Sequence, residues 1–179
     1  DLFAVMGCVN SGDDTLDGKY LLMTRDLTLP DGWTPIGTGT AYVSNNSPGA
    51  AIYPFEGIFD GGGHTLTVPV GGRCLIGFPN DCTIRNLNVY GEQIEGYGLV
   101  DNYTVGVGCT IENVTLKSGT KTLKSGFIGG YGNFTVTIRN CTIEKDVVIG
   151  YDRKQSNIGG FAGEFNGYIE NCVNHGTVY

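Results

Sequence analysis

The residues of this chain that could do chemistry are mainly carboxylates placed near other polar side chains. Asp60 and His64 flank three glycines in Asp-Gly-Gly-Gly-His. Such a pair can exchange protons with a substrate as general acid and base. The same residues also fit a tight turn in which His64 packs against or bonds to a neighbouring segment, and we prefer this interpretation. The sequence therefore gives no catalytic residue.

Metal-ligating residue types are also present, but their spacing is that of turns. Asp13, Asp14 and Asp17 form the acidic cluster nearest to a calcium site, and Gly12 and Gly18 flank them as in an ordinary polar loop. The six cysteines include no Cys-x-x-Cys pair and the chain has two histidines, which argues against a structural zinc site. We predict no metal site and no cofactor.

These polar residues have to be positioned by a repeated element. Four segments share the pattern of an aromatic or Thr residue, Ile, a charged residue and Asn: Thr83-Ile84-Arg85-Asn86, Thr110-Ile111-Glu112-Asn113, Thr137-Ile138-Arg139-Asn140 and Tyr168-Ile169-Glu170-Asn171. Their asparagines are 27, 27 and 31 residues apart. A nearly fixed period of this size is typical of stacked repeats.

A Gly-hydrophobic element precedes each of these segments: Leu75-Ile76-Gly77-Phe78, Gly98-Leu99-Val100, Gly126-Phe127-Ile128-Gly129 and Gly159-Gly160-Phe161-Ala162-Gly163. Each unit therefore holds two or three short β-type runs and has no room for a ten-residue helix. Leucine-rich and helical repeats have different patterns. We predict an all-β fold, a right-handed parallel β-helix of about five to six coils.

Side-chain alternation supports this prediction, because successive residues of a strand face opposite sides. The isoleucines then point into the coil, and the charged residues Arg85, Glu112, Arg139 and Glu170 form an outward ladder of alternating sign. The asparagines occupy bends with left-handed backbone angles, where each amide can bond to the Asn of the next coil.

The same register places two pairs of cysteines on neighbouring coils, Cys82 with Cys109 and Cys141 with Cys172. Neighbouring Cα atoms about 4.8 Å apart are within the range of a disulfide. The Cβ vectors of such neighbours run side by side, however, and buried Cys packs well as a small hydrophobic residue. We expect stacked free thiols, and disulfides remain the alternative.

The composition agrees with an all-β solenoid and limits the partners. The chain has 179 residues, of which 30 are Gly, with 16% charged residues, a net charge of −7 and a pI near 4.6. So much Gly without a collagen period argues against a helical domain. Because Lys and Arg do not cluster, we expect no nucleic-acid partner. No apolar run reaches the length of a membrane span, so we expect no membrane insertion.

The N-terminal part differs from the repeats. Residues 1–12 have apolar side chains at helical spacing and are expected to form a short cap on the open end of the coils. Residues 18–179 are expected to form the coils, and 1–179 a single, monomeric domain. No capping element follows Val178, and no signal peptide begins at Asp1. We therefore expect this domain to be a fragment of a longer surface protein.

Several Gly-rich and aromatic blocks stand out in the chain: Gly159–Gly163 with Gly167–Val173 and Gly176–Val178, and upstream Trp33–Gly37 and Phe55–Leu66. In these blocks the chain resembles the GLUG-type repeat regions of bacterial surface proteins. It implies a secreted or cell-wall-attached bacterial protein with adhesive or carbohydrate-facing roles. It supplies no catalytic residue.

We therefore expect a non-catalytic, extracellular module of the bacterial cell surface that serves in adhesion or as a rigid spacer. Host or bacterial glycans or surface proteins are the expected partners, and the sequence does not identify the ligand-binding residues. Tyr90, Tyr97, Tyr103, Tyr131 and Tyr151 lie near turns, where they either stack on sugars or cover the Gly-rich backbone. The alternative function is that of a carbohydrate-active β-helix enzyme, a polysaccharide lyase or glycoside hydrolase.

Overall fold

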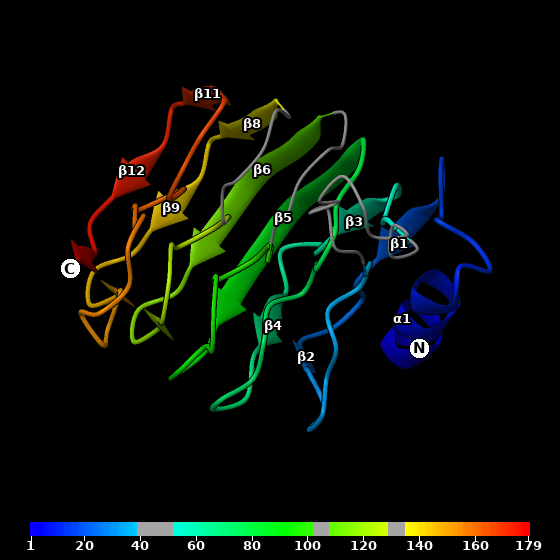
Figure 1. The fold of residues 1–179 in the computed structure, drawn as a ribbon, viewed down its shortest axis with the longest axis horizontal. Helices are drawn as coiled ribbons and strands as arrows, with labels where there is room; N and C mark the ends of the chain where they lie inside the picture. The colour runs from blue at the N-terminus through cyan, green and yellow to red at the C-terminus, as the bar shows by residue number, and fades with distance from the viewer. Residues whose placement is uncertain (39–51, 102–107, 129–134) are drawn as a thin grey trace, which may run out of the picture.

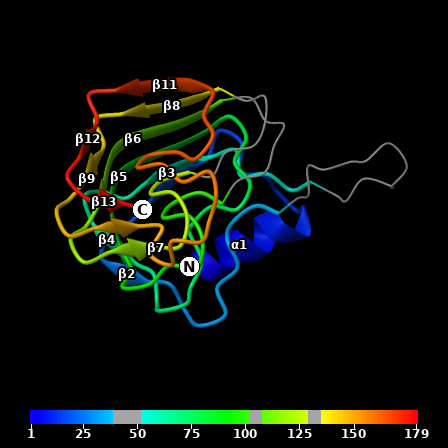
Figure 2. The same ribbon diagram turned by 60° about the vertical axis from the view of Figure 1, so that its left-hand side comes forward.

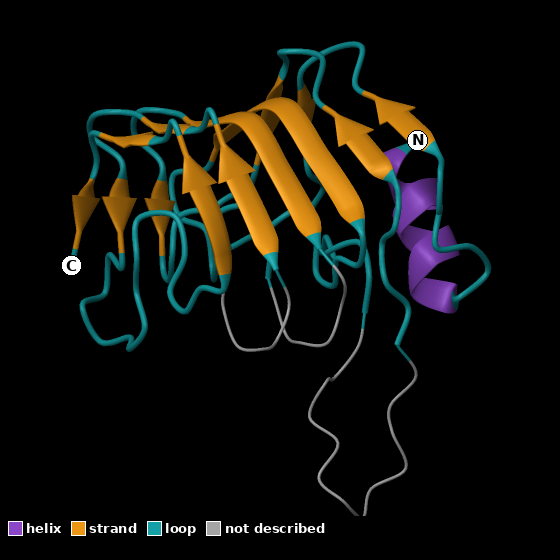
Figure 3. Ribbon diagram, turned by 90° about the horizontal axis from the view of Figure 1, so that it is seen from above, coloured by secondary structure: helices purple, strands orange, loops and turns teal. Residues whose placement is uncertain are grey.

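The chain winds into a β-solenoid, seen in a computed structural model that describes residues 1–38, 52–101, 108–128 and 135–179. The solenoid has about four turns, and its strands stack in parallel from the N-terminal to the C-terminal end (Figure 1). Helix α1 (Leu2–Ser11) lies at the N-terminal end (Figure 3). The prediction of a parallel all-β solenoid with a short N-terminal helix is confirmed.

The strands form two parallel sheets, which follow different sides of the coil (Figure 2). The larger sheet contains β1 (Tyr20–Leu22), β2 (Leu27–Thr28), β3 (Ile58–Asp60), β4 (Thr65–Thr67), β5 (Cys82–Tyr90), β6 (Cys109–Leu116), β8 (Val136–Arg139), β9 (Thr142–Ile143), β11 (Gly167–Glu170) and β12 (Val173–Asn174). The smaller sheet contains β7 (Lys121–Thr122), β10 (Val148–Ile149) and β13 (Thr177–Val178). Isolated parallel bridges join the Gly-hydrophobic elements of successive coils, from Ile36 through Ile76, Val100 and Ile128 to Ala162.

The pairing register of the four repeats is the predicted one. Ile84, Ile111, Ile138 and Ile169 are aligned in neighbouring strands. The first three of these isoleucines are fully buried, because they stack as one inward column. Since a one-residue slip would turn this whole column outward, burial of the isoleucines fixes the register.

The asparagines next to these isoleucines also behave as predicted. Asn86, Asn113, Asn140 and Asn171 have φ between 51° and 54°, in the left-handed region that Asn tolerates better than most residues. The chain therefore bends at the same place in each coil. Inward columns resume after the bend with Leu87, Val114 and Cys141, all buried.

Close contact between coils explains the glycines that precede the strands. A Cβ on Gly98 would lie 1.9 Å from the carbonyl oxygen of Gly126, and one on Gly126 would lie 2.1 Å from that of Gly160. Neither Gly98 nor Gly126 has a positive φ. These two positions therefore need glycine because backbones of successive coils approach each other closely, rather than because the chain turns there.

Helix α1 covers the N-terminal end of the solenoid, as expected. The Asp1 side chain accepts a hydrogen bond from the Phe3 N–H at the helix start, and Gly12 ends the helix in a left-handed conformation. Val9 is fully buried against the first coil. The Asn10 side chain bonds to the Pro35 carbonyl and to the Gly37 N–H.

The expected number of coils, five to six, is wrong, because the solenoid has about four turns. That expectation assigned all of residues 18–179 to coils. The N-terminal strands do not keep this spacing: β2 ends at Thr28 and β3 begins only at Ile58. Residues 39–51 of this connection lie outside the described part of the chain.

The stacking of the cysteines follows the prediction. Cys82 and Cys109 are register partners, and their Sγ atoms lie 3.3 Å apart. Cys172 lies over Cys141, since the Val173 N–H donates to the Cys141 carbonyl. All six cysteines lie in described residues and are free thiols.

Candidate functional site

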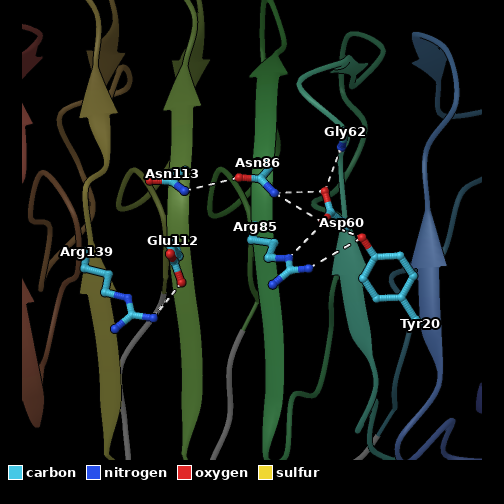
Figure 4. Close-up of polar contacts among 8 residues, drawn as sticks. All are labelled: Tyr20, Asp60, Gly62, Arg85, Asn86, Glu112, Asn113 and Arg139. Atoms are coloured by element: carbon cyan, nitrogen blue, oxygen red, sulfur yellow. Dashed lines mark hydrogen bonds and ion pairs between the residues drawn. The ribbon is translucent and has the colours of Figure 1, made fainter.

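The outer face of the larger sheet carries a row of polar side chains, most of them bonded to one another, which we call the polar ladder. It consists of Tyr20, Asp60, Arg85, Asn86, Glu112, Asn113, Arg139 and Glu170, and Figure 4 shows all of these except Glu170. The members come from strands β1, β3, β5, β6, β8 and β11, which lie side by side in that order. The register of these strands therefore fixes the positions of the polar groups.

Asp60 is the N-terminal carboxylate of the polar ladder, at the end of β3. Register pairing places it beside Arg85, so the alternation of charge begins one coil earlier than the four repeats indicate. A turn of three glycines follows, and Gly62 has a φ of 59° and donates its N–H to Asp60 Oδ1. This glycine turn lets the backbone return toward the carboxylate it has just passed.

The Asp60 carboxylate is buried and accepts four further hydrogen bonds besides that of Gly62. Tyr20 Oη donates over 2.7 Å and Arg85 Nε over 2.8 Å, both to Oδ2, and Asn86 Nδ2 lies 3.1 Å from Oδ1 and 3.2 Å from Oδ2. Although burial opposes ionisation, these donors together hold the pKa of Asp60 far below its ordinary value. Asp60 is therefore an ionised structural anchor, and its lone pairs are already engaged.

The next carboxylate of the polar ladder, Glu112, forms an ion pair with the coil on its C-terminal side. Arg139 Nη2 lies 2.7 Å from Glu112 Oε2, and both side chains are partly exposed. In the same way Asp60 pairs with Arg85 of the following coil. Each of these two carboxylates thus binds the arginine one coil further toward the C-terminus.

The asparagine amides form a second line beside the charges. Asn113 Nδ2 donates to Asn86 Oδ1 over 3.2 Å, and Asn86 Nδ2 in turn donates to Asp60. This confirms, for the first step, the predicted bond between asparagines of neighbouring coils. This line of amides ends at the ionised Asp60, which accepts hydrogen bonds from the Asn86 amide.

Asp60 and His64 have different polar partners in the fold. The His64 Nδ1 atom lies 3.4 Å from Asp26 Oδ1, on the preceding coil, and the backbone N–H of His64 donates to the Gly61 carbonyl. The preferred interpretation, a tight turn with His64 bonded to a neighbouring coil, is confirmed.

Two residues of the acidic cluster near the N-terminus make local hydrogen bonds. Asp13 accepts a hydrogen bond from the Ser11 hydroxyl, and Asp14 accepts one from the Leu16 N–H. Within the described residues, no three His, Cys, Asp or Glu side chains gather closely enough to hold a metal ion.

The tyrosines differ in their availability to a ligand. Tyr97 is buried and the Lys124 ammonium lies over its ring, so this ring is not free to stack on a sugar. Tyr151 donates its hydroxyl to Glu95, and burial is the main cause of its raised pKa. Tyr90 is half-buried beside Gly119. Tyr103 and Tyr131 lie outside the described residues.

Clefts along the described part of the solenoid include the following two. One of about 750 Å³ lies between α1 and strands β1 and β2, and its one acidic side chain is Asp1, the cap of the helix. The other, of about 230 Å³, contains Asp101, which is bonded to Arg73. Neither cavity brings two free carboxylates together.

Sequence reasoning missed the roles of Tyr20 and Asp60 in the polar ladder. Asp60 precedes Arg85 by 25 residues rather than 27, and Gly61 stands where the later repeats have Asn. The sign of the charge at Asp60 could have revealed its role, because an acidic residue one coil before Arg85 continues the alternation of acidic and basic residues.

Comparison with protein-family models, with curated proteins and with solved structures finds no match. The fold alone is shown. Among the described residues, no helix has the length and apolar character needed to cross a membrane.

Proposed function

We propose that this chain is a non-catalytic, extracellular module of a bacterial surface protein, and that it acts as a rigid spacer or adhesive scaffold. The proposal rests chiefly on the polar ladder. Its N-terminal charges are used within the fold, since Asp60 is bonded to Arg85 and Glu112 to Arg139. Side chains bonded to each other across coils stiffen the stack and are poorly suited to move protons for a substrate.

The extracellular and bacterial parts of the proposal rest on the resemblance to GLUG-type repeat regions. A solenoid suits such a surface role because each coil contacts its neighbours along one axis, which gives an extended, regular face. The sheet that carries the polar ladder presents such a face over six stacked strands.

The alternative is a carbohydrate-active enzyme with the same fold. Glycoside hydrolysis needs two carboxyl groups about 5–10 Å apart, one of them able to give up or take a proton. Asp60 is fully hydrogen-bonded, and the two described cavities lack such a pair. These observations support the non-catalytic role.

The two functions are separated by one set of measurements on the intact protein. The chain is incubated with a panel of bacterial and host polysaccharides, and products are followed as new reducing ends and as unsaturated uronic acids. In parallel, labelled protein is applied to a glycan array. We expect no product from any polymer. Product formation that Asp60→Asn or Glu112→Gln abolishes in folded protein would overturn the proposal.

The adhesive and spacer roles predict different array results. Specific glycan binding that survives Glu112→Gln, a change on the outer face, but is lost on unfolding supports a scaffold with its ligand site elsewhere. If the array stays silent, the spacer role predicts a rod of constant length in small-angle X-ray scattering across salt concentrations. A collapse of that length at high salt would contradict a rigid spacer.

A further inference from the structure

Two buried thiols face each other across neighbouring coils in the middle of the solenoid. Cys82 begins strand β5 and Cys109 begins strand β6, and the two residues are register partners. They are only 3% and 2% exposed. Their Sγ atoms lie 3.3 Å apart, so that one thiol donates to the other. We call these two residues the thiol pair.

The second pair of stacked cysteines is arranged differently. The Cys141 thiol donates to the Arg139 carbonyl over 3.2 Å, and the Cys172 thiol donates to the Glu170 carbonyl over 3.2 Å. These two thiols are therefore directed at backbone oxygens, whereas the hydrogen bond of the thiol pair joins the two sulfur atoms. Stacking of cysteines on neighbouring coils does not by itself turn their sulfurs toward each other.

The backbone around the thiol pair meets the distance requirement of a disulfide. Register partners in neighbouring strands have Cα atoms about 4.8 Å apart, and disulfides span Cα atoms about 4.4–6.8 Å apart. A disulfide holds its sulfurs at about 2.05 Å. Starting from 3.3 Å, the sulfurs have to approach by roughly 1 Å, which small rotations of the two side chains supply. The strands can therefore keep their register when the bond forms.

We propose that Cys82 and Cys109 form a disulfide when the chain folds in the presence of a disulfide oxidant such as glutathione disulfide, and that this bond closes one coil of the solenoid covalently. One cysteine thiolate attacks a sulfur of the oxidant and releases a first glutathione, and the other attacks the resulting mixed disulfide and releases a second. Both cysteine sulfurs are oxidised, the oxidant is reduced, and the two thiol protons end on the two glutathiones. This inference is independent of the proposed surface role.

Burial determines when the thiol pair reacts. In the folded, reduced chain the adjacent Cys109 thiol and burial raise the pKa of Cys82, so little thiolate is present to attack an oxidant. Exchange therefore takes place while the strands are still open, during folding. Once formed, the bond is covered by the same coils and is protected from reductants. The redox conditions met during folding thus set the stability of the finished solenoid.

The position of the thiol pair makes this bond effective. Cys82 and Cys109 are 27 residues apart, so the bond removes from the unfolded chain the entropy of closing a loop of that length. The same bond ties β5 to β6 (Figure 1). For a chain of this size, the bonded protein should melt roughly 5–10 °C above the reduced protein.

The test refolds the intact chain from urea, either with a mixture of reduced and oxidised glutathione or with reductant alone. Thiols are then alkylated in denaturant and counted by mass spectrometry. One disulfide leaves four alkylated cysteines instead of six. Trypsin cleaves at Arg85, between Cys82 and Cys109, so the bonded pair appears as two cross-linked peptides that a reductant separates. Cys82→Ala removes the thiol pair, and Cys141→Ala is the matched control in the second pair.

We expect the cross-linked peptides in the wild type and in Cys141→Ala after refolding with glutathione, and not in Cys82→Ala. Native bonded protein should keep the bond in dithiothreitol for a time that suffices to remove it in urea. Six alkylated cysteines in the wild type, or a cross-link that persists in Cys82→Ala, would overturn the proposal. A bonded protein that melts no higher than the reduced one, or is reduced equally fast with and without urea, would do the same.

Discussion

Asp60→Asn tests the central contact of the polar ladder. Asn has nearly the same shape as Asp and keeps one oxygen that can accept from the Gly62 N–H. Its amide nitrogen, however, replaces Oδ2 and brings N–H donors to the place where Arg85 Nε and Asn86 Nδ2 already donate. The variant therefore leaves the guanidinium without its buried counter-charge and places donors against donors.

The magnitude follows from burial of the pair. Removing one partner of a fully buried ion pair costs about 3–5 kcal/mol. The Arg85 side chain is 37% exposed and can regain part of its hydration, so the cost should be lower. We expect a loss of about 2–3 kcal/mol in the free energy of unfolding. For a chain of this length this corresponds to a Tm lower by roughly 5–10 °C.

Urea denaturation of the wild type and the variant measures this loss. Glu112→Gln is the matched control, because it removes a carboxylate from the same sheet face where the pair is partly exposed, and it should cost about 0.5 kcal/mol. If both variants lose the same stability, Asp60 is not the anchor inferred here.

The pH dependence gives an independent check. Because the pKa of folded Asp60 is depressed, its ionised form stabilises the fold fully above the pKa of the unfolded chain, about 3.9. This contribution is lost as the pH falls from there toward the folded pKa. The stability difference between wild type and Asp60→Asn should thus be constant near neutral pH and shrink below about pH 4. A difference that stays constant into strong acid would contradict the assignment.

Three further variants or treatments test the remaining structure. Gly98→Ala forces a Cβ against the next coil and should lower the free energy of unfolding by about 2 kcal/mol or more. Gly7→Ala, on the open face of α1, should raise it by at most about 1 kcal/mol, and thermal melting measures both. Asn113→Ala should lower the free energy of unfolding by about 1 kcal/mol, because Ala disfavours the left-handed backbone at this position. Asn113→Gly should lower it clearly less, because Gly adopts that conformation freely, and urea denaturation measures both. Brief alkylation of native protein should label Cys8 and Cys172 first, by peptide mass spectrometry, because the other four thiols are buried, and burial raises the pKa of Cys141 to about 12.

The register of the coils was predictable because two constraints on the same short segment agree. Ile111 must face inward, and Asn113, two residues later, must occupy a left-handed bend. Together they allow one alignment with the neighbouring coils, and that alignment also pairs Cys82 with Cys109 and Arg85 with Glu112. Local sequence contains all of this information.

The anchor of the candidate site depends on information that is not local. Asp60 meets Tyr20 across 40 residues, through a connection that has no repeat period. The need for glycine at Gly98 comes from the backbone of Gly126 on the next coil, so a local pattern shows the glycine but not its reason. For the same reason the number of turns was overestimated, since the strands before Ile58 do not follow the repeat.

Alternation of charge also specifies the order in which the coils stack. If the coil of Glu112 were skipped during folding, Arg85 would lie beside Arg139, two like charges at the distance of neighbouring strands. The isoleucine column would tolerate that error, because Ile84 fits on Ile138 as well as it fits on Ile111. The apolar columns therefore set the register within a coil, while the outward charges separate correct neighbours from coils two periods apart.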